Sequence, residues 1–493
     1  MSNPSDNTHI STDTNSDETN SRRNFLRAGA GLVGAAAAAP LLSAPAQAQP
    51  TDADLTAVLS RPRILIKGGV VLSLDRAVGD FAQGDVLIED GTIRDVGPGI
   101  TATDAAVINA TNQIVIPGFV DTHHHFYQGI LRNILPNGLL NPDYQRDISN
   151  TLTAAYLPDD VYAGSLITAL GMIDHGTTTA VDTSQVQHTR AHTDASIRAL
   201  QESGLRVVYA YSRGTGPASQ FPRDVMRLAS TTFSSKNQLI TLALGTGLDE
   251  AMFRAAREAG VPTVSHGVSN NTEQALFALN RAGLLKPGDE YIHCTHLSDA
   301  AWKLIKDSGG HVSLAVPIEM AMGHGLPPIQ DALDHGIRPS LSSDVDVTMA
   351  QDPFTVMRAA FTLQRLGVLQ RARTGAQNLP PLLTCRDVLE FATIEGARCT
   401  GLDHKVGTLT PGKDADIVML RADRLNVWPL NNAAGAVVNL MNPSNVETVF
   451  IAGKPRKWRG NLVGVSVPRM LRLVSQARDG VVRRSGFKMD LLG

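Results

Sequence analysis

Cysteine is scarce in this sequence, and the few cysteines present form no paired motif. Cys294, Cys385 and Cys399 are the three cysteines, and no two of them make a CxxC pair. An odd number of scattered cysteines is not a disulfide framework. The chain therefore depends on a buried hydrophobic core, and 493 residues are enough for one large domain and a smaller one.

A strong charge of one sign is also missing. The formal net charge is −3, and charged residues make up 18% of the chain. Surfaces that bind nucleic acid are usually strongly basic, so no nucleic-acid partner is expected. After residue 48 there is no apolar run of about 18 residues or more, so the mature chain is not expected to insert into a membrane.

The first 48 residues are organised like an export signal. A polar stretch leads to Arg22-Arg23-Asn24-Phe25-Leu26, an apolar run extends from Ala28 to Leu42, and Ala46-Gln47-Ala48 is a small-x-small cleavage site. Residues 1–48 resemble a twin-arginine signal peptide cleaved after Ala48. The alternative is a chance Arg-Arg pair before a short apolar helix. The resemblance implies export of the folded protein by the twin-arginine translocase, to the periplasm or outside the cell.

Strand-like segments stand near both ends of the mature chain. Residues 62–115 contain short apolar runs such as Ile64-Leu65-Ile66, and Asp90-Gly91 is typical of a hairpin turn. Residues 406–465 show the same pattern, for example in Asp416–Leu420. We expect the two segments to pair into one small β-sandwich domain, with residues 466–493 as a C-terminal extension.

Between these segments, residues 116–405 alternate short β-rich runs with helical stretches. Helices are expected at 194–204, 250–260, 299–309 and 328–336. The eight β-rich runs are Ile116–His125, Thr177–Val186, Leu205–Ser212, Leu239–Gly245, Pro262–Gly267, Tyr291–His296, His311–Val316 and Ile337–Asp344. Eight strand–helix units predict an α/β fold of the (β/α)8, or TIM, barrel type. An open doubly wound sheet is the other possibility, but no GxGxxG follows a strand.

Histidines gather where these runs end. His123 and His125 close the first run and, two residues apart on a strand, project to the same side, whereas His124 projects to the other. Taken alone, this could be a polar strand end with incidental histidines. However, His266 ends the fifth run, His293 and His296 the sixth, and Asp344 the eighth. A barrel brings its strand ends to one mouth, so these side chains are expected to converge.

Three histidines and one aspartate form a suitable ligand set for a divalent metal ion. Zinc is the first choice, and iron, manganese or cobalt are alternatives. The fourth run contains no lysine that could bridge two metals, so one ion is expected. Such an ion lowers the pKa of bound water to about 7. His293 is preferred over His296 as the base or electrophile beside the metal, and Asp344 can both bind the metal and accept a proton from water.

Several motifs resemble the amidohydrolase superfamily, specifically its cytosine deaminase and chlorohydrolase-like branch. They are Ile116–His125, the sixth-strand segment His293–Asp299, Ser342-Ser343-Asp344, and the return segment Gly407–Asp416. The resemblance covers about residues 62–465. It implies that His123, His125, His266 and Asp344 bind the metal, and that His293 is the catalytic histidine. It also implies hydrolysis of C–N bonds, with some members displacing chloride from rings.

The sequence departs from that branch at two places. Its deaminases carry a glutamate three residues after the fifth-strand histidine, where this chain has Ser269, and the nearest glutamate is Glu273. The usual Pro-x-x-Asn pattern after the seventh run is replaced by residues 317–325, which contain Glu319 and His324. We hypothesise that Glu319 or His324 reaches the mouth and supplies the missing acid; a solvated loop charge is the alternative for Glu319.

Further residues are candidates for substrate binding. Phe126, Tyr127, Gln128 and Arg132 follow the first-run ligands, and Arg132 could hold an anionic group. His296 and His324 lie near the same rim. Packing or capping roles are the alternative for these residues, and His175, away from any run end, is read as structural.

Three functions are compatible with these residues. The first is a metal-dependent hydrolase of a non-peptide C–N bond, such as an amide, lactam or carbamate, in a small molecule. The second is an aminoheterocycle deaminase or ring-dehalogenating hydrolase on the same scaffold, and the third a non-enzymatic periplasmic binding protein. A homodimer is a further expectation. The missing glutamate favours the first function over the second, and a complete ligand set argues against the third.

Overall fold

The computed structural model describes residues 52–235 and 237–492. The segment predicted to be a signal peptide lies outside the described residues.

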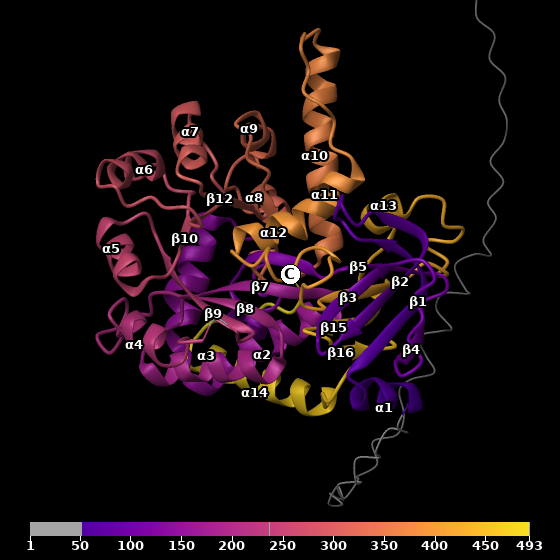
Figure 1. Ribbon diagram of the computed structural model, residues 1–493. Helices are drawn as coiled ribbons and strands as arrows, with labels where there is room; N and C mark the ends of the chain where they lie inside the picture. The colour runs from indigo at the N-terminus through magenta and orange to yellow at the C-terminus, as the bar shows by residue number, and fades with distance from the viewer. Residues whose placement is uncertain (1–51, 236, 493) are drawn as a thin grey trace, which may run out of the picture. The chain divides into compact units, whose positions relative to one another are not determined.

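Eight parallel strands form the central sheet of the larger part (Figure 1). Each is hydrogen-bonded in parallel to the next, and an isolated bridge between His124 and Asp344 joins the last strand end to the first. The predicted (β/α)8 barrel is therefore confirmed. The strands are β6 (Phe119–His124), β7 (Thr177–Ser184), β8 (Arg206–Tyr211), β9 (Ile240–Thr246), β10 (Thr263–His266), β11 (Glu290–Ile292), β12 (His311–Leu314) and β13 (Ser340–Leu341).

Helices connect and surround these strands. The four helices expected from the sequence are present as α3 (Arg190–Ser203), α5 (Glu250–Ala259), α7 (Asp299–Asp307) and α9 (Ile329–Asp334). Helix α5 shows how residues at the two ends of a helix fix where it begins and stops. Asp249 accepts a hydrogen bond from the Met252 N–H at its start, and Gly260 ends it with a φ of 68°. The other barrel helices are α2 (Pro158–Asp174), α4 (Asp224–Ser230), α6 (Thr272–Arg281), α8 (Val316–Ala321), α10 (Pro353–Arg373), α11 (Cys385–Phe391) and α12 (Ile394–Cys399).

Strands from both ends of the described chain share a second sheet, as expected. It contains nine strands, with β5 paired antiparallel to β14 where the two chain segments meet. The predicted turn at Asp90-Gly91 connects two of them, and both residues have the positive φ that such a turn requires. The strands are β1 (Arg63–Leu72), β2 (Asp80–Glu89), β3 (Thr92–Gly97), β4 (Ala106–Asn109), β5 (Gln113–Pro117), β14 (Ile417–Arg421), β15 (Val446–Ile451), β16 (Lys454–Trp458) and β17 (Asn461–Leu462).

This sheet has its own hydrophobic core and is tied to the barrel by buried charges. Ile64, Val86 and Ile417 belong to that core. Arg206, at the start of β8, donates hydrogen bonds to Asp414 and Asp416 of the segment that leads into β14. Its side chain is only 3% exposed, so the ion pair is shielded from water.

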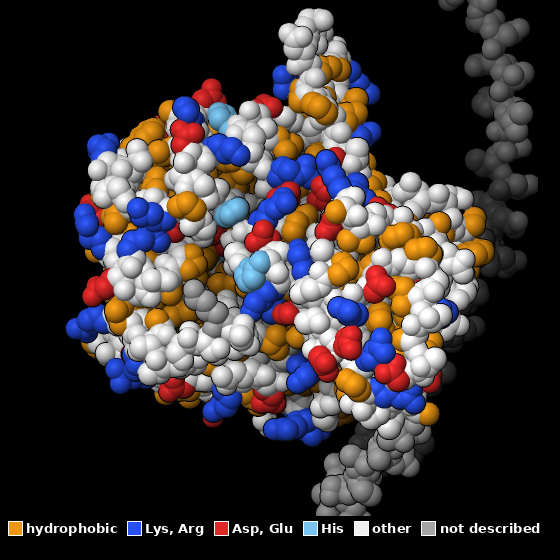
Figure 2. Space-filling model, in the orientation of Figure 1, with side chains coloured by type: hydrophobic (Ala, Val, Ile, Leu, Met, Phe, Trp, Pro, Cys, Tyr) orange, Lys and Arg blue, Asp and Glu red, His pale blue; other side chains and the backbone are white. Residues whose placement is uncertain are grey.

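The C-terminal extension forms a further helix, α14 (Val467–Ser485), which packs against α2. Within the described ranges, no helix is long and apolar enough to cross a membrane. Basic and acidic side chains are interspersed over the face in Figure 2, in keeping with the small net charge of the chain.

Candidate metal centre and barrel-mouth cavity

The predicted metal ligands converge at the carboxyl ends of the barrel strands. The His123 ring centre lies 4.9 Å from that of His125 and 4.8 Å from that of His266. Asp344, just after β13, brings Oδ1 to 3.1 Å from His123 Nε2 and 3.6 Å from His125 Nε2. Residues 221 positions apart in the sequence are thus neighbours, as a closed barrel requires.

Thr183 in β7 orients two of the imidazoles. Its carbonyl oxygen accepts a hydrogen bond from His125 Nδ1 over 2.9 Å, and its hydroxyl lies 3.0 Å from His123 Nδ1. Because a carbonyl only accepts, His125 carries its proton on Nδ1 and presents the Nε2 lone pair to the cluster. His123 Nε2 is buried without a hydrogen-bond partner among the described residues.

Charge in the cluster also suits a cation. Burial lowers the pKa of His125 to about 3, and it lowers the pKa values of His123 and His266 as well. Burial opposes ionisation of Asp344, but the close contact with His123 and the other surrounding histidines hold its pKa well below the usual value. Three neutral imidazoles and one carboxylate therefore lie together in overlapping groups: His123 is grouped with His125 and Asp344, and also with His266 and His293. This donor set fits zinc or a similar divalent ion.

His124 points away from the cluster, as the strand alternation predicts. Its Nδ1 lies 3.0 Å from the Ser343 hydroxyl, and its Nε2 lies 3.8 Å from Asp346 Oδ2. His124 therefore lies behind the predicted ligands and contacts Ser343 and Asp346 there.

His293 stands beside the ligand set and is held by Glu319. Its Nε2 lies 3.8 Å from Asp344 Oδ2, and its Nδ1 lies 3.0 Å from Glu319 Oε1. Burial would lower the pKa of His293, but the hydrogen bond to Glu319 and the two nearby carboxylates raise it. His293 and Asp344 have φ values of 69° and 60°, a left-handed conformation that is costly for such residues and concentrates at functional sites.

Glu319 does not reach the mouth, which corrects the expectation for this residue. It is fully buried, and its Oε1 also accepts the backbone N–H of Ala315 over 2.8 Å. Glu319 therefore lies behind His293 and acts on it. His324 does reach the mouth and stacks on His293 with a ring-centre distance of 4.7 Å. Burial lowers the pKa of His324 to about 4, so this imidazole is neutral.

A cavity of about 970 Å³ opens above the cluster. Its lining combines aromatic, amide and charged side chains, a mixture found in small-molecule sites. The lining includes His125, Tyr127, Asn141, Tyr144, Gln145, Arg213, Asp249, His266, Ser269, His293, His324 and Asp344.

The predicted substrate-binding residues divide into two groups. Tyr127 and His324 line the cavity. Phe126, Gln128, Arg132 and His296 are not among the described residues that line it, and this corrects their expected position.

Three of those four side chains are engaged elsewhere, and the fourth is exposed. The chain turns into η1 (Phe126–Leu131) directly after His125, which sends Phe126 into the main hydrophobic core. Gln128 is buried and donates to the hydroxyls of Tyr127 and Tyr144. Arg132 pairs with Asp346 on the far side of His124, and His296 is exposed beside Gly325.

Position 269, where the resemblance leads us to expect a glutamate, lies in the wall of the cavity. Ser269 lines it, with its hydroxyl donated to Asn271 Oδ1 over 2.6 Å. Glu273 accepts the backbone N–H of Ser298 and is not a described lining residue. Among the described lining residues, the acidic ones are Asp249 and Asp344.

Several lining or supporting residues were not singled out from the sequence. Tyr144 comes from η2 (Leu140–Leu152), and Arg213 and Asp249 follow the third and fourth strands. Two features of the sequence could have indicated these residues. One is the length of the first βα connection, and the other is the presence of charged residues directly after strands. Thr183 was hidden within an ordinary strand.

Curated proteins similar to this chain include enzymes named as deaminases. A 5'-deoxyadenosine deaminase of Methanosarcina mazei is 27% identical over 411 residues, covering 79% of this chain and 92% of the relative. A 5-methylthioadenosine/S-adenosylhomocysteine deaminase of Caldicellulosiruptor saccharolyticus is 24% identical over 432 residues, covering 83% and 96%.

Solved structures show the same fold. An adenosine deaminase from Xanthomonas campestris with bound zinc superposes with a TM-score of 0.75 at 21% identity, covering 85% of this chain and 98% of that one. Atrazine chlorohydrolase from Arthrobacter aurescens, complexed with zinc, gives 0.75 at 19% identity, covering 84% and 100%. A sequence model of the amidohydrolase family matches residues 114–456, more than half of the chain. The chain therefore belongs to the amidohydrolase family and is a hydrolase.

Proposed function

We propose that this enzyme hydrolyses a non-peptide C–N bond, in an amide, lactam, carbamate or similar group of a small molecule, with the help of one zinc ion. The observation that carries the proposal is the convergence of inward-facing imidazoles and one carboxylate beside His293, under a cavity of about 970 Å³. The zinc in two structural neighbours supports the choice of metal.

His123, His125, His266 and Asp344 would hold the ion. A divalent ion in such a site lowers the pKa of bound water to about 7 and polarises the substrate oxygen or nitrogen. Metal analysis of the purified enzyme distinguishes zinc from iron, manganese or cobalt.

The chain itself handles protons and developing charge. Asp344 Oδ2 faces His293 Nε2 across 3.8 Å at the base of the cavity, so both atoms can exchange protons with a substrate placed there. The Glu319 carboxylate fixes the His293 ring through Nδ1 and favours its protonated form. His293 is then a suitable donor to a leaving nitrogen or to a charged oxygen in the transition state.

The residue at position 269 bears on the choice of substrate. A serine whose hydroxyl is already donated to Asn271 cannot protonate a ring nitrogen as a glutamate would. Amide, lactam or carbamate hydrolysis needs an activated water, a stabilised carbonyl oxygen and a protonated leaving nitrogen. A bound ion would supply the first two, and His293 would protonate the leaving nitrogen.

Deamination of an aminoheterocycle is the second candidate. It is favoured by the similarity to enzymes named 5'-deoxyadenosine deaminase, although that likeness is below 30% identity. Ring dehalogenation rests on the fold shared with atrazine chlorohydrolase. Export by the twin-arginine route and homodimer formation stay predictions of the sequence.

Parallel substrate panels test the proposal. Metal-loaded enzyme is incubated with amides, lactams and carbamates, and separately with adenosine, 5'-deoxyadenosine and chlorotriazines; products are identified by mass spectrometry, and ammonia is measured. We expect turnover in the first panel that disappears in Asp344→Asn. Ammonia release from the aminopurines alone would replace the first candidate with the second.

A further inference from the structure

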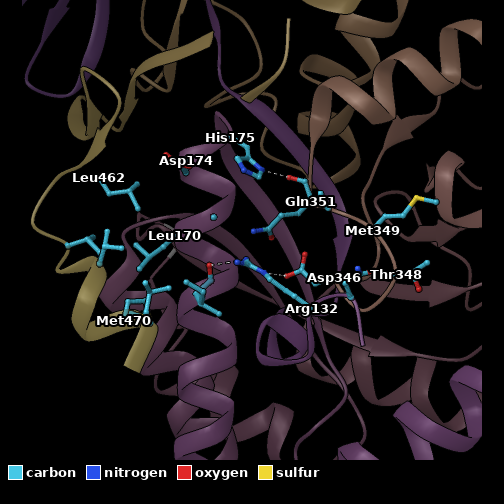
Figure 3. Close-up of a pocket in the computed structure, with 17 residues that line it drawn as sticks. Arg132, Leu170, Asp174, His175, Asp346, Thr348, Met349, Gln351, Leu462 and Met470 are labelled. Atoms are coloured by element: carbon cyan, nitrogen blue, oxygen red, sulfur yellow. Dashed lines mark hydrogen bonds and ion pairs between the residues drawn. The ribbon is translucent and has the colours of Figure 1, made fainter. Parts of the chain in front are cut away.

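A second cavity of about 590 Å³ lies outside the barrel mouth (Figure 3). It is bounded by α2, by the segment between β13 and α10, and by the start of α14. The two cavities share no described lining residue. The proposed reaction makes no use of it.

One side of this cavity is apolar and the other polar. Figure 3 shows Leu170 of α2, Leu462 of β17 and Met470 of α14 on one side, and Gln351, Arg132 and Asp346 opposite them. Such a cavity suits a ligand with an apolar body and a polar end.

The Gln351 side chain is the unusual feature of the polar side. Gln351 is 3% exposed, yet both its amide oxygen and its amide nitrogen lack a hydrogen-bond partner in the described part of the chain. Its backbone oxygen is held by His175 Nδ1 over 2.8 Å, while its side chain lines the cavity and extends toward Leu170 (Figure 3). Buried polar atoms nearly always find partners, so this amide is available to a bound molecule.

Gly171 makes room for that amide. A Cβ atom at this position in α2 would lie 2.1 Å from Gln351 Nε2 and 2.9 Å from Arg132 Nη2. Glycine within a helix is unfavourable, so the position is better explained by the space it leaves for Gln351 than by helix formation.

The charged residues around the cavity are already paired. Arg132 Nε lies 3.2 Å from Asp346 Oδ2, and Asp174 Oδ1 lies 2.8 Å from Lys457 Nζ. An ionic ligand would have to compete with these pairs, whereas a neutral one would not. A ligand would therefore need one hydrogen-bond acceptor and one donor side by side, to pair with the N–H and C=O groups of the Gln351 amide.

We propose that this cavity is a second small-molecule site, which binds a neutral molecule with an apolar body and a planar head carrying adjacent N–H and C=O groups. Carboxamides, lactams and ureas have this head. The head pairs with the Gln351 amide, and the body lies against the apolar side of the cavity.

Benzamide is a suitable probe, because its ring fills apolar space and its head matches Gln351. Methyl benzoate has a similar shape without N–H groups, and benzoate tests an anion in the same place. Crystals of the full enzyme are soaked with each compound, and affinities are measured by calorimetry. We expect benzamide hydrogen-bonded to Gln351 with a Kd on the order of 1 mM, and at least about tenfold weaker binding of both controls.

Two variants tie the binding to this cavity. Gln351→Leu keeps the side-chain size and removes the unpaired amide, so it should fold at least as stably and lose at least about tenfold in benzamide affinity. Met470→Trp should fill the cavity from α14 and exclude the probe. Tyr144→Phe, in the barrel mouth, should leave benzamide at Gln351.

The proposal is overturned if methyl benzoate binds as well as benzamide, if Gln351→Leu and Met470→Trp both bind benzamide like the unmodified enzyme, or if benzamide occupies only the barrel mouth. It is also overturned if a second copy of the chain fills the cavity in the crystal and in solution.

Discussion

His293 is a side chain whose behaviour depends on a neighbour far away in the sequence. Glu319 accepts from its Nδ1 and from the Ala315 N–H, while Glu319 Oε2 has no hydrogen-bond partner among the described residues. Burying a carboxylate in this way costs free energy, unless its charge stabilises a neighbouring group. The arrangement fixes the ring, so that Nε2 faces Asp344 and the cavity.

Glu319→Gln should therefore reduce turnover without emptying the metal site. Glutamine keeps the shape but removes the charge that favours protonated His293. We expect kcat to fall by about 10²-fold with little change in KM, since Glu319 does not line the cavity. Steady-state kinetics and metal content are measured together.

Glu273→Gln is the matched control. Among the described residues, the hydrogen bond of the Glu273 side chain is with the backbone N–H of Ser298 at the rim. Its kinetics should stay close to those of the unmodified enzyme. A Glu319→Gln enzyme that keeps its metal and works at an unchanged rate would show that the carboxylate has no part in the reaction.

Some residue positions could be predicted from the sequence and others could not. His123, His125, His266 and Asp344 follow from strand ends, because a barrel fixes where strand ends meet. Phe126 in η1 and Arg132 directly after η1 lie beyond the strand, where the alternation of a strand no longer gives the direction of a side chain. The contact between Glu319 and His293 depends on a loop path that has no periodicity.

Among the secondary-structure elements, β5 pairs with β14 and so joins strands from the two end segments of the described chain. Arg206 connects this pair of strands to β8. Arg206 reaches Asp416 with two hydrogen bonds, at 3.1 and 3.0 Å, and Asp414 with one at 2.8 Å. Asp416 also receives the backbone N–H of Ala452. One guanidinium, itself only 3% exposed, thus connects three segments of the chain.

Arg206→Met should lower the free energy of unfolding by about 3–5 kcal/mol, because it leaves buried Asp416 without its counter-charge. Arg254→Met is the control: Arg254 pairs with Glu250 on the surface, and its loss should cost about 0.5 kcal/mol or less. Urea unfolding of both variants gives the comparison. Equal losses in the two variants would mean that the buried network adds nothing.

The elements themselves were mostly readable from the sequence. All eight runs became barrel strands, because short apolar runs between helices leave few alternatives. Strand β11 nevertheless ends at Ile292 and not at His296, since His293 and Cys294 adopt positive φ. Nothing in the residue types of this segment predicts the left-handed turn.

For the whole molecule, closure of the barrel is the weak point that a metal would reinforce. Strand β13 has two residues, and the isolated bridge between His124 and Asp344 completes the ring of strands. The predicted ligands come from β6 and the residue directly after it, from β10 and from the turn after β13. A shared ion would join three parts of the barrel that are distant in the sequence.

Removing the metal should therefore destabilise the enzyme as well as inactivate it. An ion that binds only the folded chain, at a concentration of about 1,000 times its Kd, adds about 4 kcal/mol of stability. We expect chelation to lower Tm by roughly 5–10 °C, and added zinc to restore it, in scanning calorimetry. Asp344→Asn already lacks one ligand, so its Tm should respond much less to the chelator. An unchanged Tm after verified loss of metal would mean that the His123–Asp344 junction holds without an ion, and that the cluster serves catalysis alone.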